Sequence, residues 1–253
     1  MELTDLTWPA VDALDRDTPV VFPIAALEQH GHHMPVFTDS LLLGEVVLRA
    51  KLHPVAERVL FAPLQWLGNS HHHADMPGTL SASPRVYLDL LRDLAENFIA
   101  HGFRRVVFVN GHGGNMTPSE QALFELRQKY RERSDLLLLS LTYWDSADPS
   151  GDVAGLTQSH MGHACEWETS MMLAIRPELV VGDVAGIAEV PFGSGAEPGY
   201  RAWTMPDRSE PGHIGNPAKA TAEKGEALLN VFAAGVAKFL QRVADSDGEG
   251  WDL

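Results

Sequence analysis

Carboxylate and imidazole side chains are concentrated in residues 28–39, EQHGHHMPVFTD, directly after an apolar run. Zinc, manganese and iron accept imidazole nitrogen and carboxylate oxygen, and a catalytic metal site uses about three protein ligands and one open position. A second histidine segment, NGHGGN at residues 110–115, follows another apolar run. Together the two segments favour a metal site over a cluster of surface histidines.

The elements that must position these side chains follow a βαβα order. Short β-branched runs predict strands at residues 20–27, 59–67, 105–110 and 136–143, and helical spacing predicts helices near 40–52, 84–101 and 118–133. This order predicts an α/β fold with a mainly parallel sheet and helices on both faces. Open sheets of this kind bind ligands at the carboxyl ends of their strands, where both histidine segments begin.

The second half of the chain is less regular. Residues 160–176 are expected to be helical, residues 183–217 are rich in glycine and proline and predict loops over the site, and a final helix is expected from about 217 to 243. Residues 244–253 are small and acidic, which predicts a flexible tail. We expect a single domain over residues 1–253.

Composition narrows the class of protein. Hydrophobic residues make up 45% and charged residues 21%, as in soluble globular proteins. The balance of 19 basic and 34 acidic residues gives a net charge of −15, which argues against nucleic acid and anionic membranes as partners. Cys165 is the only cysteine, so an intrachain disulfide and a cysteine zinc site are excluded. No signal-peptide pattern or 18-residue apolar run is present, so a cytoplasmic enzyme is expected.

Four motifs in order give the chain a family resemblance. They are ExHGxHxPxxTD at 28–39, GxSxxHxxMPGT at 68–79, NGHGGN at 110–115 and HxxxxETS at 163–170. Together they resemble the creatininase family of metal-dependent amidohydrolases, over nearly the whole chain. The resemblance implies a three-layer α/β/α sandwich, a centre of two divalent ions (zinc, manganese or iron) and a homo-oligomer, often a hexamer built as a trimer of dimers.

The resemblance also implies a ligand set. Glu28 and His112 would bind one metal, His30 the other, and Asp39 would bridge them. Creatininase itself has a glutamate ligand where this chain has Gly114, so we expect another carboxylate, Glu168, to complete the second site. The same departure argues against creatinine as the substrate. Two simpler interpretations stay open: a solvated strand-end carboxylate for Glu28 and a helix cap for Asp39.

Further residues are candidates for catalysis and substrate binding. His163, with Glu168, is expected to be catalytic and to protonate the leaving group, provided that the helix carrying Glu168 starts after His163. His32 and His33 are equally compatible with a supporting role and with an ordinary loop position, and Cys165 is expected to be a small buried residue. The expected substrate-binding residues are Ser70, His73, Gly113, Gly114, Trp144 and His160. The two glycines would offer backbone N–H groups to an oxyanion. Trp144 is equally compatible with core packing.

The reaction expected from these residues is metal-assisted hydrolysis. The substrate would be a small polar compound with a cyclic amide, formamide or similar non-peptide C–N bond. Hydrolysis or lyase chemistry on a keto-sugar or ketocyclitol is an alternative, because the same ions can polarise a ketone. A non-catalytic metal-binding scaffold is a third interpretation.

Overall fold

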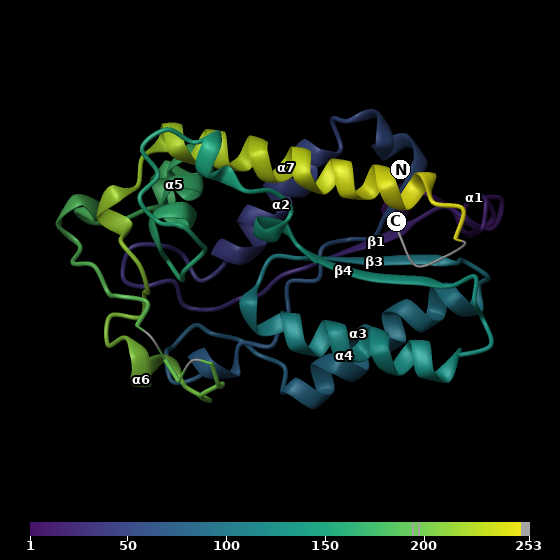
Figure 1. Ribbon diagram of the computed structural model, residues 1–253, viewed down its shortest axis with the longest axis horizontal. Helices are drawn as coiled ribbons and strands as arrows, with labels where there is room; N and C mark the ends of the chain where they lie inside the picture. Colours follow the sequence, from purple (N-terminus) through teal and green to yellow (C-terminus); the bar gives the residue numbers. More distant parts are fainter. Residues whose placement is uncertain (194, 197, 249–253) are drawn as a thin grey trace.

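Four parallel strands form the centre of the protein in a computed structural model that describes residues 1–193, 195–196 and 198–248 (Figure 1). The strands are β1 (Val20–Ile24), β2 (Leu60–Phe61), β3 (Arg105–Asn110) and β4 (Leu137–Thr142), in the order β2-β1-β3-β4. Ile24 pairs with Asn110 and Asn110 pairs with Thr142. The carboxyl ends of β1, β3 and β4 therefore lie level at one edge of the sheet.

Helices cover both faces of this sheet. On one face lie α2 (Thr38–Ala50), α5 (Glu166–Ile175) and α7 (Ala222–Asp245), and on the other lie α3 (Pro84–Ala100) and α4 (Met116–Lys129) (Figure 1). Alternate residues of β3 serve the two cores: Val107 and Val109 face α2, α5 and α7, whereas Val106 and Phe108 face α3 and α4. The predicted three-layer α/β/α fold is confirmed.

The remaining elements are short. Two are α-helices, α1 (Trp8–Asp12) and α6 (Met205–Arg208). The 3-10 helices are η1 (Leu3–Asp5), η2 (Pro54–Arg58), η3 (His71–His73), η4 (Gly113–Asn115), η5 (Tyr143–Asp145), η6 (Pro149–Gly151), η7 (Pro177–Leu179), η8 (Val184–Gly186) and η9 (Pro217–Lys219).

Several elements are shorter than the sequence predicted. β2 has two residues because Pro63, just beyond it, has no N–H to donate to a ladder. Residues 160–165 are not helical, since Ala164 adopts a left-handed φ of 47° and α5 begins only at Glu166. α7 begins after Thr221, whose side chain accepts a hydrogen bond from the Lys224 N–H as a helix cap.

The end of the chain also differs from the expected tail. Residues 244 and 245 belong to α7, whereas residues 249–253 of the expected flexible segment lie outside the described residues. By length and composition α7 is apolar enough to cross a membrane, with a mean hydropathy of 1.3. Half of that stretch is buried within the protein, and its apolar face packs against α2 and α5. The composition of α7 is therefore that of a core helix.

The contact between α5 and α7 depends on a glycine. A methyl group at Gly225 would lie 1.9 Å from the carbonyl oxygen of Ser170, which belongs to the backbone of α5. Gly225→Ala must therefore push the helices apart, and we expect it to lower the free energy of unfolding by about 1–3 kcal/mol. Gly44→Ala is the control, because Gly44 has only Leu64 Cδ1 nearby, at 3.9 Å.

Urea unfolding followed by circular dichroism measures both variants. The control should gain about 0.5–1 kcal/mol, because alanine is a better residue than glycine in a helix interior. Equal stability changes in the two variants would contradict the close packing of α5 on α7.

Candidate metal centre

Asp39 lies between two histidines of the centre. Its Oδ1 is 3.2 Å from His30 Nε2, and its Oδ2 is 3.2 Å from His112 Nδ1. Asp39 occupies the first turn of α2, whose cap position is Phe37, so the interpretation of Asp39 as the helix cap is wrong. A carboxylate with one oxygen toward each imidazole has the arrangement expected of a bridging ligand.

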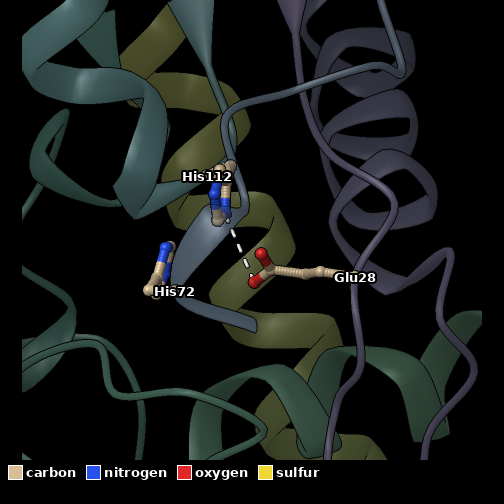
Figure 2. Close-up of side chains that lie close together, drawn as sticks. All are labelled: Glu28, His72 and His112. Atoms are coloured by element: carbon tan, nitrogen blue, oxygen red, sulfur yellow. Dashed lines mark ion pairs between the residues drawn. The ribbon is translucent and has the colours of Figure 1, made fainter. Parts of the chain in front are cut away.

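Glu28 extends from the loop after β1 toward the same point. Its Oε1 lies 3.3 Å from His112 Nδ1, 3.3 Å from His73 Nε2 and 3.5 Å from His163 Nδ1. Figure 2 shows the Glu28 carboxylate pointing toward the rings of His72 and His112. Glu28 is only 1% exposed, so it is not a solvated strand-end carboxylate.

Glu168 approaches the other side of His30. Its Oε1 is 3.6 Å from His30 Nε2, and its Oε2 accepts a hydrogen bond from the Ala164 N–H at 2.5 Å. Because α5 starts at Glu166, Glu168 lies in the first turn and His163 lies on the preceding loop, as its expected role required. The structure therefore brings Glu28, His30, Asp39, His112 and Glu168 together.

The donor atoms fit divalent cations. Glu28 Oε2, Asp39 Oδ2 and His30 Nε2 are buried and have no hydrogen-bond partner within the described part of the chain. Among the described residues, three groups each have ligand atoms within 4.8 Å of one another: Glu28 with His72 and His112, Glu28 with His30 and His163, and His30 with Asp39 and Glu168. Ligands that each lie about 2.1 Å from a tetrahedral cation are about 3.4 Å apart, close to the separations seen here.

Three imidazoles of the centre are oriented by backbone carbonyls. His30 Nδ1 donates to Glu28 O (3.1 Å), His112 Nε2 donates to Asn69 O (3.1 Å) and His163 Nε2 donates to Gln29 O (2.9 Å). In each ring the other nitrogen then faces a carboxylate, and in the neutral ring this nitrogen carries the lone pair that a cation would bind. Outer hydrogen bonds of this kind fix the tautomer of metal-binding histidines.

The charges of the centre alter the acidities of its members. Burial raises the pKa of Glu28. For His112, burial lowers the pKa, but the neighbouring carboxylates of Glu28 and Asp39 outweigh burial and raise the pKa to about 10. Burial likewise opposes the effect of His30 and His112, which together hold the pKa of Asp39 well below its usual range. The two carboxylates thus hold a proton on the His112 ring, and a divalent cation that bound between them would displace this proton.

Gln29 connects two further histidines and was not predicted as a site residue. Its side-chain amide donates to Gly212 O at 2.8 Å and lies 2.7 Å from His73 Nδ1 and 3.0 Å from His163 Nε2. Burial lowers the pKa of both His73 and His163, so these rings are neutral. The position of Gln29 between Glu28 and His30 was the only sequence signal for it.

A cavity of about 940 Å³ opens over the centre. Gly113, Gly114, His73 and Trp144 belong to its lining, as their predicted substrate-binding roles require. Phe192, Tyr200 and Trp203 from the glycine-rich and proline-rich region also line it. The remaining lining residues include Asn69, His72, Met116, Glu120, Met161, His163, Arg208 and Ile214.

Two predicted substrate-binding residues lie elsewhere. Ser70 is fully buried behind the centre, and its Oγ is 3.3 Å from His112 Nε2, so it supports a ligand. His160 is exposed and packs on Phe192 with ring centroids 4.2 Å apart, outside the cavity lining as the described residues define it. His33 is buried, and its Nε2 lies 2.9 Å from Thr169 Oγ1 on α5.

Buried carboxylates and oriented imidazoles at the carboxyl edge of a parallel sheet define a metal-binding enzyme centre. Residues 4–240 match the creatininase family, described as creatinine amidohydrolase. The chain is 33% identical to the creatinine amidohydrolase of Pseudomonas putida, over 92% of this chain and 93% of that one. It is 31% identical to the mycofactocin precursor peptide peptidase of Mycolicibacterium smegmatis, over 88% and 84%.

A relative matched over part of its length and several solved structures are also similar to this chain. The chain is 25% identical to the 3-dehydro-scyllo-inosose hydrolase of Thermotoga maritima, over 64% of this chain and 51% of that one. A creatininase crystal structure matches with a TM-score of 0.79 and 27% identity, over 97% and 98% of the two chains. A creatininase structure described with manganese also matches, with a TM-score of 0.76 and 30% identity over 97% and 99% of the two chains. A mutant creatininase described as Zn-Zn type matches with a TM-score of 0.74 and 32% identity over 97% and 98%.

The chain therefore belongs to the creatininase family. It is a hydrolase of C–N bonds with a site for divalent metal, and the family resemblance predicted from the four motifs is confirmed.

The shared position of Asp39 leads to a test of the ligand set. We expect Asp39→Asn to lower the content of both ions, because one carboxylate oxygen faces each histidine, whereas Glu168→Gln should remove chiefly the ion beside His30. Metal per chain is measured by elemental analysis after exhaustive dialysis. Asp152→Asn, at an exposed position, is the control and should keep the content of the unmodified protein. Unchanged content in Asp39→Asn would refute the bridging role.

Proposed function

We propose that this protein uses two divalent ions, zinc, manganese or iron, to hydrolyse a non-peptide C–N bond in a small polar substrate. A cyclic amide, a formamide or a similar group is the proposed class. The observation that carries this proposal is the Asp39 carboxylate, with one oxygen 3.2 Å from His30 and the other 3.2 Å from His112. Glu28 and His112 would hold one ion, His30 and Glu168 the other, and Asp39 both.

When bound, such ions lower the pKa of a water molecule toward about 7 and polarise a carbonyl group. The buried carboxylates Glu28, Asp39 and Glu168 would hold the ions at the base of the cavity. Gly113 and Gly114 lie in the cavity lining, and nothing lies within 4 Å of the position that a side chain of Gly113 would take. Their N–H groups are the proposed donors to the developing oxyanion.

His163 is the proposed proton carrier. Its Nε2–H is donated to Gln29 O, so Nδ1 is the nitrogen that faces the centre, 3.5 Å from Glu28 Oε1. A proton taken up at Nδ1 during attack is then released to the leaving nitrogen. The nearby Glu28 carboxylate stabilises the imidazolium in between.

Two observations support other classes of substrate. A cavity of about 940 Å³ is at the upper end of the range for small-molecule sites, which leaves room for a peptide segment. The similarity to an inosose hydrolase supports a ketocyclitol as the second candidate. The non-catalytic scaffold is the weakest candidate, because the site retains a full set of metal donors and an open cavity.

A substrate panel tests the proposed reaction. Protein stripped with a chelator and reloaded with zinc or manganese is assayed against lactams, formamides, short peptides and oxidised cyclitols. We expect C–N hydrolysis that disappears on stripping and returns on reloading. His163→Ala should lower the rate by about 10²- to 10⁴-fold, because it removes the proton carrier. Turnover of cyclitols alone would favour the second candidate, and no turnover by metal-loaded protein would favour the scaffold.

We further propose that the protein is a cytoplasmic homo-oligomer, hexameric as a trimer of dimers. Exposed apolar side chains support an assembly: Trp8 is 79% exposed and Leu52 is 81% exposed. Within residues 183–217, Met205 is buried, whereas Tyr200 lines the cavity and is 86% exposed.

Light scattering after size exclusion measures this assembly. We expect an oligomer at physiological salt, where charge repulsion is screened beyond about 8 Å, that loosens at very low ionic strength because the chain carries a net charge of −15. A single peak at the monomer mass of 27.7 kDa at micromolar concentration would overturn the assembly.

A further inference from the structure

We infer that His72 is a protein ligand of the cation held by Glu28 and His112, in the space that a side chain at position 114 would need. This inference rests on the metal centre proposed above. The ligand atoms of Glu28, His72 and His112 all lie within 4.8 Å of one another. Figure 2 shows the three side chains around one space, with the Glu28 carboxylate directed between the two rings.

The His72 ring is held in place by aromatic neighbours. It stacks parallel to His112 with centroids 5.7 Å apart and an interplanar angle of 14°. The His73 ring lies 4.2 Å away, and the Trp203 ring contacts it edge-on at 5.0 Å. These contacts hold the ring in the cavity wall, where one of its nitrogens lies within 4.8 Å of the ligand atoms of Glu28 and His112.

The first two histidines of η3 have different surroundings. His71 is exposed, and its Nδ1 contacts Ser81 Oγ at 3.0 Å, away from the centre. His72 is partly buried in the cavity wall beside His112. The short helical turn thus directs one of two adjacent histidines into the centre, and it supplies His71 as a matched control.

Gly114 explains why His72 can occupy this space. A methyl group at position 114 would lie 2.9 Å from His72 Cε1, 2.5 Å from His112 Nε2 and 2.2 Å from Asn69 O. A longer side chain at position 114 and the present course of the His72 loop therefore exclude each other.

A ligand role for His72 has a chemical consequence. An imidazole ligand is neutral and borderline soft, and it suits zinc better than a carboxylate does, whereas carboxylates suit manganese. The centre keeps three buried carboxylates, Glu28, Asp39 and Glu168. We therefore expect the ion beside Glu28 and His112 to be selective for zinc over manganese through His72.

The test compares His72→Ala with His71→Ala and His112→Ala in the full-length protein. Zinc and manganese affinities are measured by competition with a chromophoric chelator. His72→Ala should weaken one of two zinc-binding events by more than the roughly 10- to 100-fold that loss of an outer hydrogen-bond partner costs. His72→Asp should regain binding but shift the preference toward manganese, and His71→Ala should bind as the unmodified protein does.

The comparison separates failure of this inference from failure of the metal centre. If His112→Ala weakens zinc binding and His72→Ala does not, His72 is a substrate contact and the inference is wrong. If neither variant changes zinc binding, the proposed centre itself fails. Should His72→Ala not fold, as judged by its melting curve in chelator, His72→Gln gives the same comparison with a side chain of similar size.

Discussion

Three carboxylates buried beside one another impose the main constraint on this protein. Glu28, Asp39 and Glu168 are each at most 4% exposed and converge on His30 and His112. Charges removed from water destabilise a fold unless positive charge lies between them. The two imidazoles do not supply a partner for every carboxylate oxygen, because Glu28 Oε2 and Asp39 Oδ2 accept no hydrogen bond from the described residues. The physical consequence is a site that attracts divalent cations.

The fold meets this constraint through elements that the sequence reveals locally. The apolar runs of β1 and β3 end level because Ile24 pairs with Asn110, so the segments after them meet at one edge. Helix α2 places Asp39 in its first turn, where the helix dipole favours a negative charge. Strand ends, motif spacing and helix starts are short-range properties, which is why the three layers and the grouping of these side chains could be predicted.

The supporting residues depend on contacts that no local pattern contains. His163 Nε2 donates to Gln29 O across 134 positions of the chain, and His112 donates to Asn69 O across 43. The His71, His72 and His73 side chains are chemically identical in the sequence, and only the turn of η3 makes His73 buried and His71 exposed. Ala164 gave no sign of the left-handed φ that ends the loop before α5. Distant contacts and backbone conformation, rather than residue type, decided these positions.

The histidines of the metal centre and the residues that line the cavity are positioned by different parts of the chain, which fits a family whose members act on different substrates. Named relatives of this chain act on creatinine, a mycofactocin precursor peptide and an inosose. Backbone carbonyls orient His30, His112 and His163, so their geometry does not depend on the side chains that line the cavity. Phe192, Tyr200 and Trp203 come from the irregular segment before α7 and form the cavity wall. Changes in that segment would alter the cavity wall while the carboxyl edge of the sheet keeps its carboxylates and imidazoles in place.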